Sequence, residues 1–145
     1  MDFGTGFRIS GSGMNAQRMR MNTISSNIAN INTVNTPEGG PYRRKDVVLE
    51  ALPEAKSFAE MLLTDPNKSV NRVQVTDIHI DTKAPLLKHE PDHPNADENG
   101  YVAYPYINLM EEMANMIQAT RAYEANVTAL NATKDMAMSA LNIGE

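Results

Sequence analysis

Two histidines and three acidic residues lie close together near residue 90, and groups of these types can hold a metal ion. The imidazoles of His89 and His93 and the carboxylate of Asp97 are typical ligands of zinc and other transition metals. Histidines four residues apart share one face of a helix, as in many catalytic zinc sites. Pro91 and Pro94 do not allow a continuous helix here, because proline lacks an N–H and clashes with the preceding turn. We therefore expect a rigid, solvated turn without metal, and a metal-dependent enzyme using these three ligands is the alternative.

No other group of residues has the order or spacing of a known catalytic or cofactor site. The sequence contains no serine, histidine and acid in the order of a hydrolase triad, and no phosphate-binding P-loop. Two Gly-x-Gly sequences begin at Gly4 and Gly11, but neither follows a predicted strand, so they favour close helix packing over a dinucleotide site. Glu111 and Glu112 are adjacent at a predicted helix start, where the helix dipole stabilises acids without catalysis. The sequence thus predicts a protein that is not an enzyme and uses no cofactor.

The composition predicts a chain that is only marginally stable by itself. It has 145 residues, no Trp, and only 20% of Leu, Ile, Val and Phe combined. This share is at the border below which a chain buries too little apolar surface to fold alone. Ten Met and many Ala partly compensate, because both suit contacts between helices. We therefore expect neighbouring subunits to supply part of the stability.

The net charge of −5 is spread unevenly along the chain. Residues 1–45 carry +4, residues 46–105 carry −6 and residues 106–145 carry −3. The two ends attract each other, but the basic excess is too small for nucleic-acid binding. No apolar run approaches the roughly 18 residues of a membrane-spanning helix, so we expect no membrane insertion. The chain opens without an apolar leader and has no Cys, so we expect neither a cleavable signal peptide nor a disulfide.

Residues 1–36 are predicted to form a first helical segment. The apolar positions that repeat with a heptad period are Phe7, Met14, Met21 and Ile28, with Ile24 and Ile31 on the alternate positions. This pattern is typical of a helix that packs along a neighbour. Four glycines before residue 14 make the start a poor isolated helix. Thr36-Pro37 is expected to end the helix.

Residues 106–145 are predicted to form a second, longer helix. Asn108 followed by Glu111 is the pattern of an N-cap with the reciprocal acid of a capping box. The positions that alternate by four and three residues are Leu109, Met113, Met116, Thr120, Tyr123, Val127, Leu130, Lys134, Ala137 and Leu141. Such a helix is about 50 Å long, whereas a globule of this size has a radius of gyration of about 15 Å. The helix therefore needs partners along its length.

Residues 37–105 contain all eight prolines and are predicted to form turns and short strands. Tyr42–Leu49 is one strand candidate. Two alternating apolar pairs, Val73 with Val75 and Ile78 with Ile80, are out of phase with each other. The change of phase, at Thr76-Asp77, predicts a bulge or a tight bend in a strand.

Together these patterns predict a mainly α fold. Two long terminal helices are expected to pair as a coiled-coil-like bundle that forms one domain, with a small, irregular, β-rich insert between them at 37–105. A short helix is expected within the insert at Pro53–Leu63, where apolar residues share one face. Arg18 and Arg20 of the first helix are expected to attract the glutamates of the second, with apolar contact dominating.

Ser10–Gln17 and Ser26–Thr33, the second with its Asn-Ile-Ala-Asn sequence, resemble the N-terminal signature of flagellar rod and hook axial proteins. Glu112–Asn126 resembles the matching C-terminal helix. Pro41–Lys45 and His93–Val102 resemble, more narrowly, the proximal rod subunits of the family. The resemblance covers nearly the whole chain, with the motifs in the order of the family.

This resemblance implies a structural role in the basal body of the bacterial flagellum. Proteins of the family are exported unfolded through the flagellum's own secretion apparatus, without signal cleavage, and polymerise helically into the rod that transmits torque from motor to hook. The implied partners are copies of the chain, other rod subunits, the export apparatus, and an MS-ring or hook-basal-body component. The residues expected at the assembly interface are Met14, Met21, Ile24, Asn27, Ile28, Asn30, Ile31, Met113, Met116, Tyr123, Asn126, Val127, Leu130 and Leu141.

Two further interpretations of the sequence stay open. The nearest is another rod or hook-base subunit of the same family, against which the short length and the segment His93–Val102 argue. The other is a soluble coiled-coil adaptor, which would need neither the Asn-Ile-Ala-Asn sequence nor helices separated by an insert. Asn27, Asn30 and Asn32 are expected to bond exposed backbone or neighbouring side chains where the helix ends, or simply to cap it.

Overall fold

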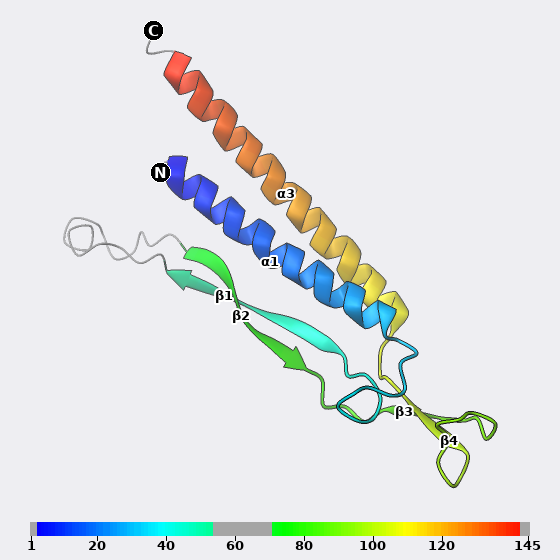
Figure 1. Ribbon diagram of the computed structural model, residues 1–145. Helices are drawn as coiled ribbons and strands as arrows, with labels where there is room; N and C mark the ends of the chain where they lie inside the picture. The colour runs from blue at the N-terminus through cyan, green and yellow to red at the C-terminus, as the bar shows by residue number, and fades with distance from the viewer. Residues whose placement is uncertain (1–2, 54–70, 143–145) are drawn as a thin grey trace.

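The computed structural model describes residues 3–53 and 71–142 and confirms the predicted fold class. The elements are α1 (Phe3–Ala29), β1 (Lys45–Pro53), β2 (Asn71–Ile80), β3 (Leu86–His89), β4 (Tyr101–Tyr104) and α3 (Leu109–Asn142). The two helices run antiparallel and in contact along α1, and the β1–β2 ribbon also packs on α1 (Figure 1). The β3–β4 hairpin projects beyond the end of the helix pair (Figure 1). The short helix expected at Pro53–Leu63 lies outside the described residues.

The helix α1 is continuous through its glycines, and it ends earlier than the sequence suggested. Glycine destabilises an isolated helix, but most helical stability in proteins comes from tertiary packing, which α3 supplies here. The last helical residue is Ala29, so the expected end at Thr36-Pro37 was wrong. The reason is Asn30, whose side-chain amide donates to Ser26 O (2.9 Å) and accepts from the Thr33 hydroxyl (3.1 Å). These bonds turn the chain away from the helix axis.

The N-cap predicted for the second helix is confirmed. Asn108 Oδ1 accepts from the backbone N–H groups of Met110 (3.0 Å) and Glu111 (3.4 Å), which have no partner inside the helix. From this cap α3 continues for 34 residues, against 27 in α1. The shorter helix therefore lies along only part of the longer one, and the C-terminal end of α3 extends past the start of α1 (Figure 1).

The β1–β2 ribbon contains the bulge that the change of phase predicted. Val48 pairs with Asp77 and Leu49 pairs with Val75, so Thr76 has no partner in the register. Because opposite residues of an antiparallel pair share a face, the bulge brings both apolar pairs of β2 to one face. That face packs on α1 and buries Val47. The strand itself starts at Lys45, three residues later than the expected Tyr42.

Candidate assembly interface

The C-terminal end of α1 and the N-terminal end of α3 meet at a buried polar group that we call the foot cluster. It consists of Asn27, Tyr42, Arg44, Lys45 and Glu112. The amide of Asn27 is fully buried and uses both of its donors and both acceptor positions. Its Nδ2 donates to Lys45 O (2.8 Å) and Glu112 Oε2 (3.1 Å), and its Oδ1 accepts from Lys45 N–H (3.0 Å) and the Tyr42 hydroxyl (3.1 Å). Asn27 thus bonds the edge of β1 as a neighbouring strand would, and ties it to both helices.

Glu112 is 1% exposed, and its charge is balanced within the foot cluster. Its Oε1 accepts a charge-assisted bond of 2.7 Å from Nε of Arg44, and Nη1 of the same guanidinium lies 3.5 Å from Asp46 Oδ2. Desolvation lowers the pKa of Arg44, but the hydrogen bond and charge of Glu112 and the charges of Asp46 and Glu111 outweigh it. The pKa of Arg44 is therefore raised above its usual value. Burying either ion without the other would be costly, so the pair holds the two helices and the loop between them in one arrangement.

Farther along the helix pair, contact depends on small residues. We call the contacts of Gly6 with Thr133 and of Gly13 with Asn126 the upper seam. A Cβ on Gly13 would lie 2.8 Å from Asn126 Oδ1, and a Cβ on Gly6 would lie 3.2 Å from Thr133 Cγ2. The two glycines are seven residues apart and their two partners are also seven apart, as expected for antiparallel helices with a heptad period. The sequence-based interpretation of these glycines as close-packing residues is confirmed. Here shape, and not hydrogen bonding, brings the helices together.

On each helix, the row of residues predicted to face the other helix lies beside the row that faces it in the structure. On α1 Met14 and Met21 are half-buried, whereas Gly13 and Asn27 of the adjacent row are buried. On α3 the residue buried most completely is Ala119, beside the expected Thr120. The apolar pattern therefore indicated the correct side of each helix but not its centre, because small and polar residues occupy the centre.

The residues expected at an assembly interface fall into three groups by exposure. Ile24 and Asn27 are buried within the subunit. Met113 and Leu141 are exposed. The half-buried remainder comprises Met14, Met21, Ile28, Asn30, Ile31, Met116, Tyr123, Asn126, Val127 and Leu130. Of these, Met21 accepts a bond from the Thr120 hydroxyl through its sulfur at 3.6 Å, across the helix pair.

Two exposed apolar patches lie at opposite ends of α3. The foot patch consists of Tyr106, Leu109, Met110, Met113 and Ile117, and the tip patch consists of Met138 and Leu141, all more than two fifths exposed. Single exposed apolar residues are ordinary, but groups of large ones mark surfaces that bind other molecules. The foot patch adjoins a groove of about 500 Å³, which Ile31, Leu86 and Pro105 help to line.

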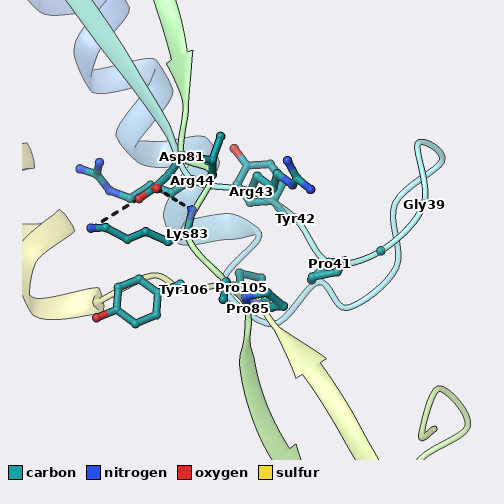
Figure 2. Close-up of a pocket in the computed structure, with 13 residues that line it drawn as sticks. Gly39, Pro41, Tyr42, Arg43, Arg44, Asp81, Lys83, Pro85, Pro105 and Tyr106 are labelled. Carbon is teal, nitrogen blue, oxygen red and sulfur yellow. Dashed lines mark hydrogen bonds and ion pairs between the residues drawn. The ribbon is translucent and has the colours of Figure 1, made fainter.

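A second pocket, of about 180 Å³, lies where the hairpin joins the helix pair (Figure 2). Prolines and tyrosines line it, together with the ion pair of Lys83 Nζ and Asp81 Oδ2 at 3.7 Å. The N–H of Lys83 also donates to Asp81 Oδ1, and this bond, more than the lysine's charge, holds the pKa of Asp81 below its usual value. Lys83 Nζ lies 5.4 Å from the ring centre of Tyr106. These contacts fix the junction but provide no reactive group.

The histidines near residue 90 take part in hairpin contacts. The ring of His89 lies edge-on to Tyr101 at 5.1 Å, and His93 Nδ1 accepts from the N–H of Asn95. Asp97 Oδ1 accepts from the N–H of Tyr101 (2.8 Å), which stabilises the loop. Within residues 3–53 and 71–142, no three His, Asp or Glu side chains are placed to hold a metal ion together.

The expected attraction between the arginines of α1 and the glutamates of α3 is not present in the form predicted. Arg18 bonds Asn15 on its own helix (3.0 Å), and neither Arg18 nor Arg20 forms an ion pair with an acid of α3 among the described residues. Glu112 pairs instead with Arg44, which is 68 positions away. The sequence analysis also did not predict the role of Tyr42 in the foot cluster. The only sequence feature that pointed to this residue was its place in the Pro41–Lys45 motif.

Two family models match the helical ends of the chain. Residues 7–35 match the model for "Flagella basal body rod protein", and residues 98–143 match the model for "Flagellar basal body rod FlgEFG protein C-terminal". These matches, which cover most of both helices, indicate the class of flagellar basal-body rod proteins.

Relatives over the full length define the family more closely. The chain is 43% identical to the flagellar basal-body rod protein FlgC of Borreliella burgdorferi, with 93% of each chain covered. It is 40% identical to FlgC of Bacillus subtilis, with 94% of this chain and 95% of that protein covered. The chain belongs to the FlgC family of flagellar basal-body rod proteins. In the described part of the chain, no helix has both the length and the apolar character needed to cross a membrane.

Proposed function

We propose that this protein is a structural subunit of the proximal flagellar rod, which assembles with copies of itself and with other rod subunits in the basal body. Membership of the FlgC family supports this function, since the relatives are named as basal-body rod proteins. Helical polymerisation and torque transmission are parts of the same proposal.

The observation that carries the proposal is the exposed apolar surface of α3. The helix is 34 residues long, and α1 covers only one side and part of its length. Met110 is 74% exposed and Leu141 is 72% exposed, at opposite ends of the helix. Contacts between unlike patches of successive copies need not close into a ring, and contacts of that kind generate helical filaments. A subunit with apolar surface at both ends of a stiff helix suits a rod that must resist shear.

The assembly surface that we propose includes the exposed and half-buried residues of the predicted interface. On α3 the exposed members are Met113 and Leu141, and Val127 is among the half-buried ones. Ile24 and Asn27 act indirectly, because their side chains are used inside the subunit. The export apparatus and a ring or hook-basal-body component are further proposed partners.

The decisive experiment separates assembly from folding. Met113→Asp with Ile117→Asp places two charges on the foot patch, where both side chains are about half exposed in the single subunit. The thermal unfolding of the purified subunit should change little, whereas a strain carrying the variant should lack motility and the rod should be absent from isolated basal bodies. Desolvation of unpaired carboxylates in a subunit contact costs several kcal/mol, which explains the expected loss.

Ala114→Asp with Gln118→Asp is the matched control, because both residues are exposed on the polar side of the same helix. This control should leave rods and motility intact. Motile cells with the foot-patch variant, or equal loss in both variants, would contradict the proposed assembly surface.

A further inference from the structure

The heptad repeat of the upper seam does not by itself fix how far one helix slides along the other. Gly6 and Gly13 face Thr133 and Asn126, and the same row of α3 continues with Ala119 on one side. A slide of seven residues would place Gly13 opposite Ala119 or opposite Thr133, and both are small enough to accept it. One heptad corresponds to about 10 Å along the helix axis. The close contacts of Gly6 and Gly13 are therefore compatible with more than one register.

The foot cluster is compatible with only one register. Asn27 meets Glu112 in the observed pairing, and its four hydrogen bonds leave no group of its amide unpaired. A slide of seven residues in one direction would place Asn27 opposite Ala119, which offers no side-chain acceptor. A slide in the other direction would carry Asn27 past the first residue of α3, Leu109. In either case Arg44 loses the 2.7 Å bond to Glu112.

We propose that the foot cluster is a register lock: it selects one alignment of α1 and α3 from the alignments that the heptad repeat allows. A buried polar side chain can fix register at a cost in stability, because wrong registers leave it unpaired. The fully buried Asn27 and the 1% exposed Glu112 have this property, and they bond each other across the helix pair. The lock concerns one subunit, and it therefore acts whether or not the chain forms a rod.

The test replaces the lock by apolar residues of similar size. Asn27→Leu, Arg44→Met and Glu112→Leu are combined, so that no buried charge is left without a partner. Cysteines at Asn22 and Ala132, both exposed, carry two spin labels in this otherwise Cys-free chain. These positions are far apart along the axis, so a slide of seven residues changes the distance between the labels by about 10 Å. Pulsed electron–electron double resonance then measures the distances between the two labels, and each register present gives its own distance.

The parent protein should give one label-to-label distance, and the triple variant should give at least one more, shifted by about 10 Å, with helix content and melting temperature maintained. Asn15→Leu, Arg18→Met and Glu111→Leu form the matched control, because they make the same exchanges at exposed positions of both helices. This control should retain a single distance. Asn27→Leu with Glu112→Leu, which keeps Arg44, should also show the additional distance.

A single unshifted distance in both lock variants would overturn the proposal, because the upper seam would then be sufficient to set the register. Loss of helix in both variants would also overturn it, because the cluster would then be needed for folding and not for selection among registers. Equal broadening in the lock variant and the surface control would show that the added apolar residues, and not the lost cluster, cause the effect.

Discussion

The two ends of the contact between α1 and α3 are held by different physical means. At the foot cluster, Asn27 and Glu112 are buried, hydrogen-bonded and matched to charged partners. At the upper seam, Gly6 and Gly13 allow close approach to Thr133 and Asn126, whose hydroxyl and amide bond their own helix at Ala129 O and Ala122 O. One end is specified by directional bonds that span three segments of the chain, and the other is specified by shape alone.

The difference shows how one subunit can combine a defined fold with surface left for assembly. Directional hydrogen bonds are satisfied in few alternative arrangements of the segments that they join. The foot cluster therefore determines the arrangement of α1, the loop before β1, and α3. Close packing is less directional than hydrogen bonding, and at the upper seam it leaves apolar side chains of α3 exposed beside the contact. The comparison predicts that substitutions at the foot cluster affect stability most and that substitutions farther along the seam affect it less.

The largest effect is expected for Glu112→Ala. The change leaves the half-buried guanidinium of Arg44 with only the more distant Asp46, and it leaves one N–H of Asn27 unpaired. Removing one partner of a buried pair costs about 3 kcal/mol or more in free energy of unfolding. Chemical denaturation of the purified subunit measures it. Glu111→Ala, an exposed neighbour, is the control, and equal losses in the two variants would contradict the distinction between them.

An intermediate effect is expected for Gly13→Val in the upper seam. A side chain at this position meets the amide of Asn126 at 2.8 Å, so Asn126 must give up its bond to Ala122 O or the helices must move apart, at about 1–3 kcal/mol. Gly11→Val is the matched control, because no atom lies within 4 Å of the Cβ it would add. Valine and glycine differ by about 0.5 kcal/mol in helix propensity, so the control should be close to neutral. Thermal melts of both variants test this, and similar destabilisation would mean that the seam is not tightly packed.

Much of this architecture could be predicted from local patterns. The N-cap at Asn108 follows from residue types within one turn, and the bulge at Thr76 follows from a break in a period-two pattern. Close packing at Gly13 was also predictable, because the sequence offers few other roles for glycine inside a helix. These features depend on residues that are close together in the sequence.

The foot cluster could not be predicted in the same way, because its members come together only in the folded chain. Arg44 and Glu112 are 68 positions apart, and at the sequence level the helix dipole already accounted for Glu112. The centre of the helix pair was also misplaced, since apolar residues were expected there and small residues occupy it. The position of a seam depends on how closely two backbones approach, and a single apolar pattern does not contain that information.

Amide hydrogen exchange of the dilute subunit should show a gradient along α1. The amides around Ile24 and Asn27 lie beside the hydrogen-bonded foot, whereas those before Gly13 belong to a glycine-rich segment held by packing and by the bond from Val73 N–H to Ser12 Oγ (3.2 Å). Exchange at the N-terminal end should be about 100-fold faster, because local opening there breaks fewer contacts. Mass spectrometry of the free subunit measures it. Uniform strong protection over residues 5–34 would contradict the gradient.

The smallest effect is expected for Arg18→Ala combined with Arg20→Ala. Arg18 is exposed and bonds only Asn15 of its own helix, and neither arginine pairs with an acid of α3 among the described residues. Arg18 is exposed and Arg20 is half-buried, but neither has such an ion pair to lose, so the free energy of unfolding should fall by only about 1 kcal/mol. Arg44→Ala, which removes one charge instead of two, should cost more, because it leaves the buried Glu112 without its cation. If the double variant is the more damaging of the two, the general charge of α1 stabilises the helix pair, and the foot cluster has no special role in it.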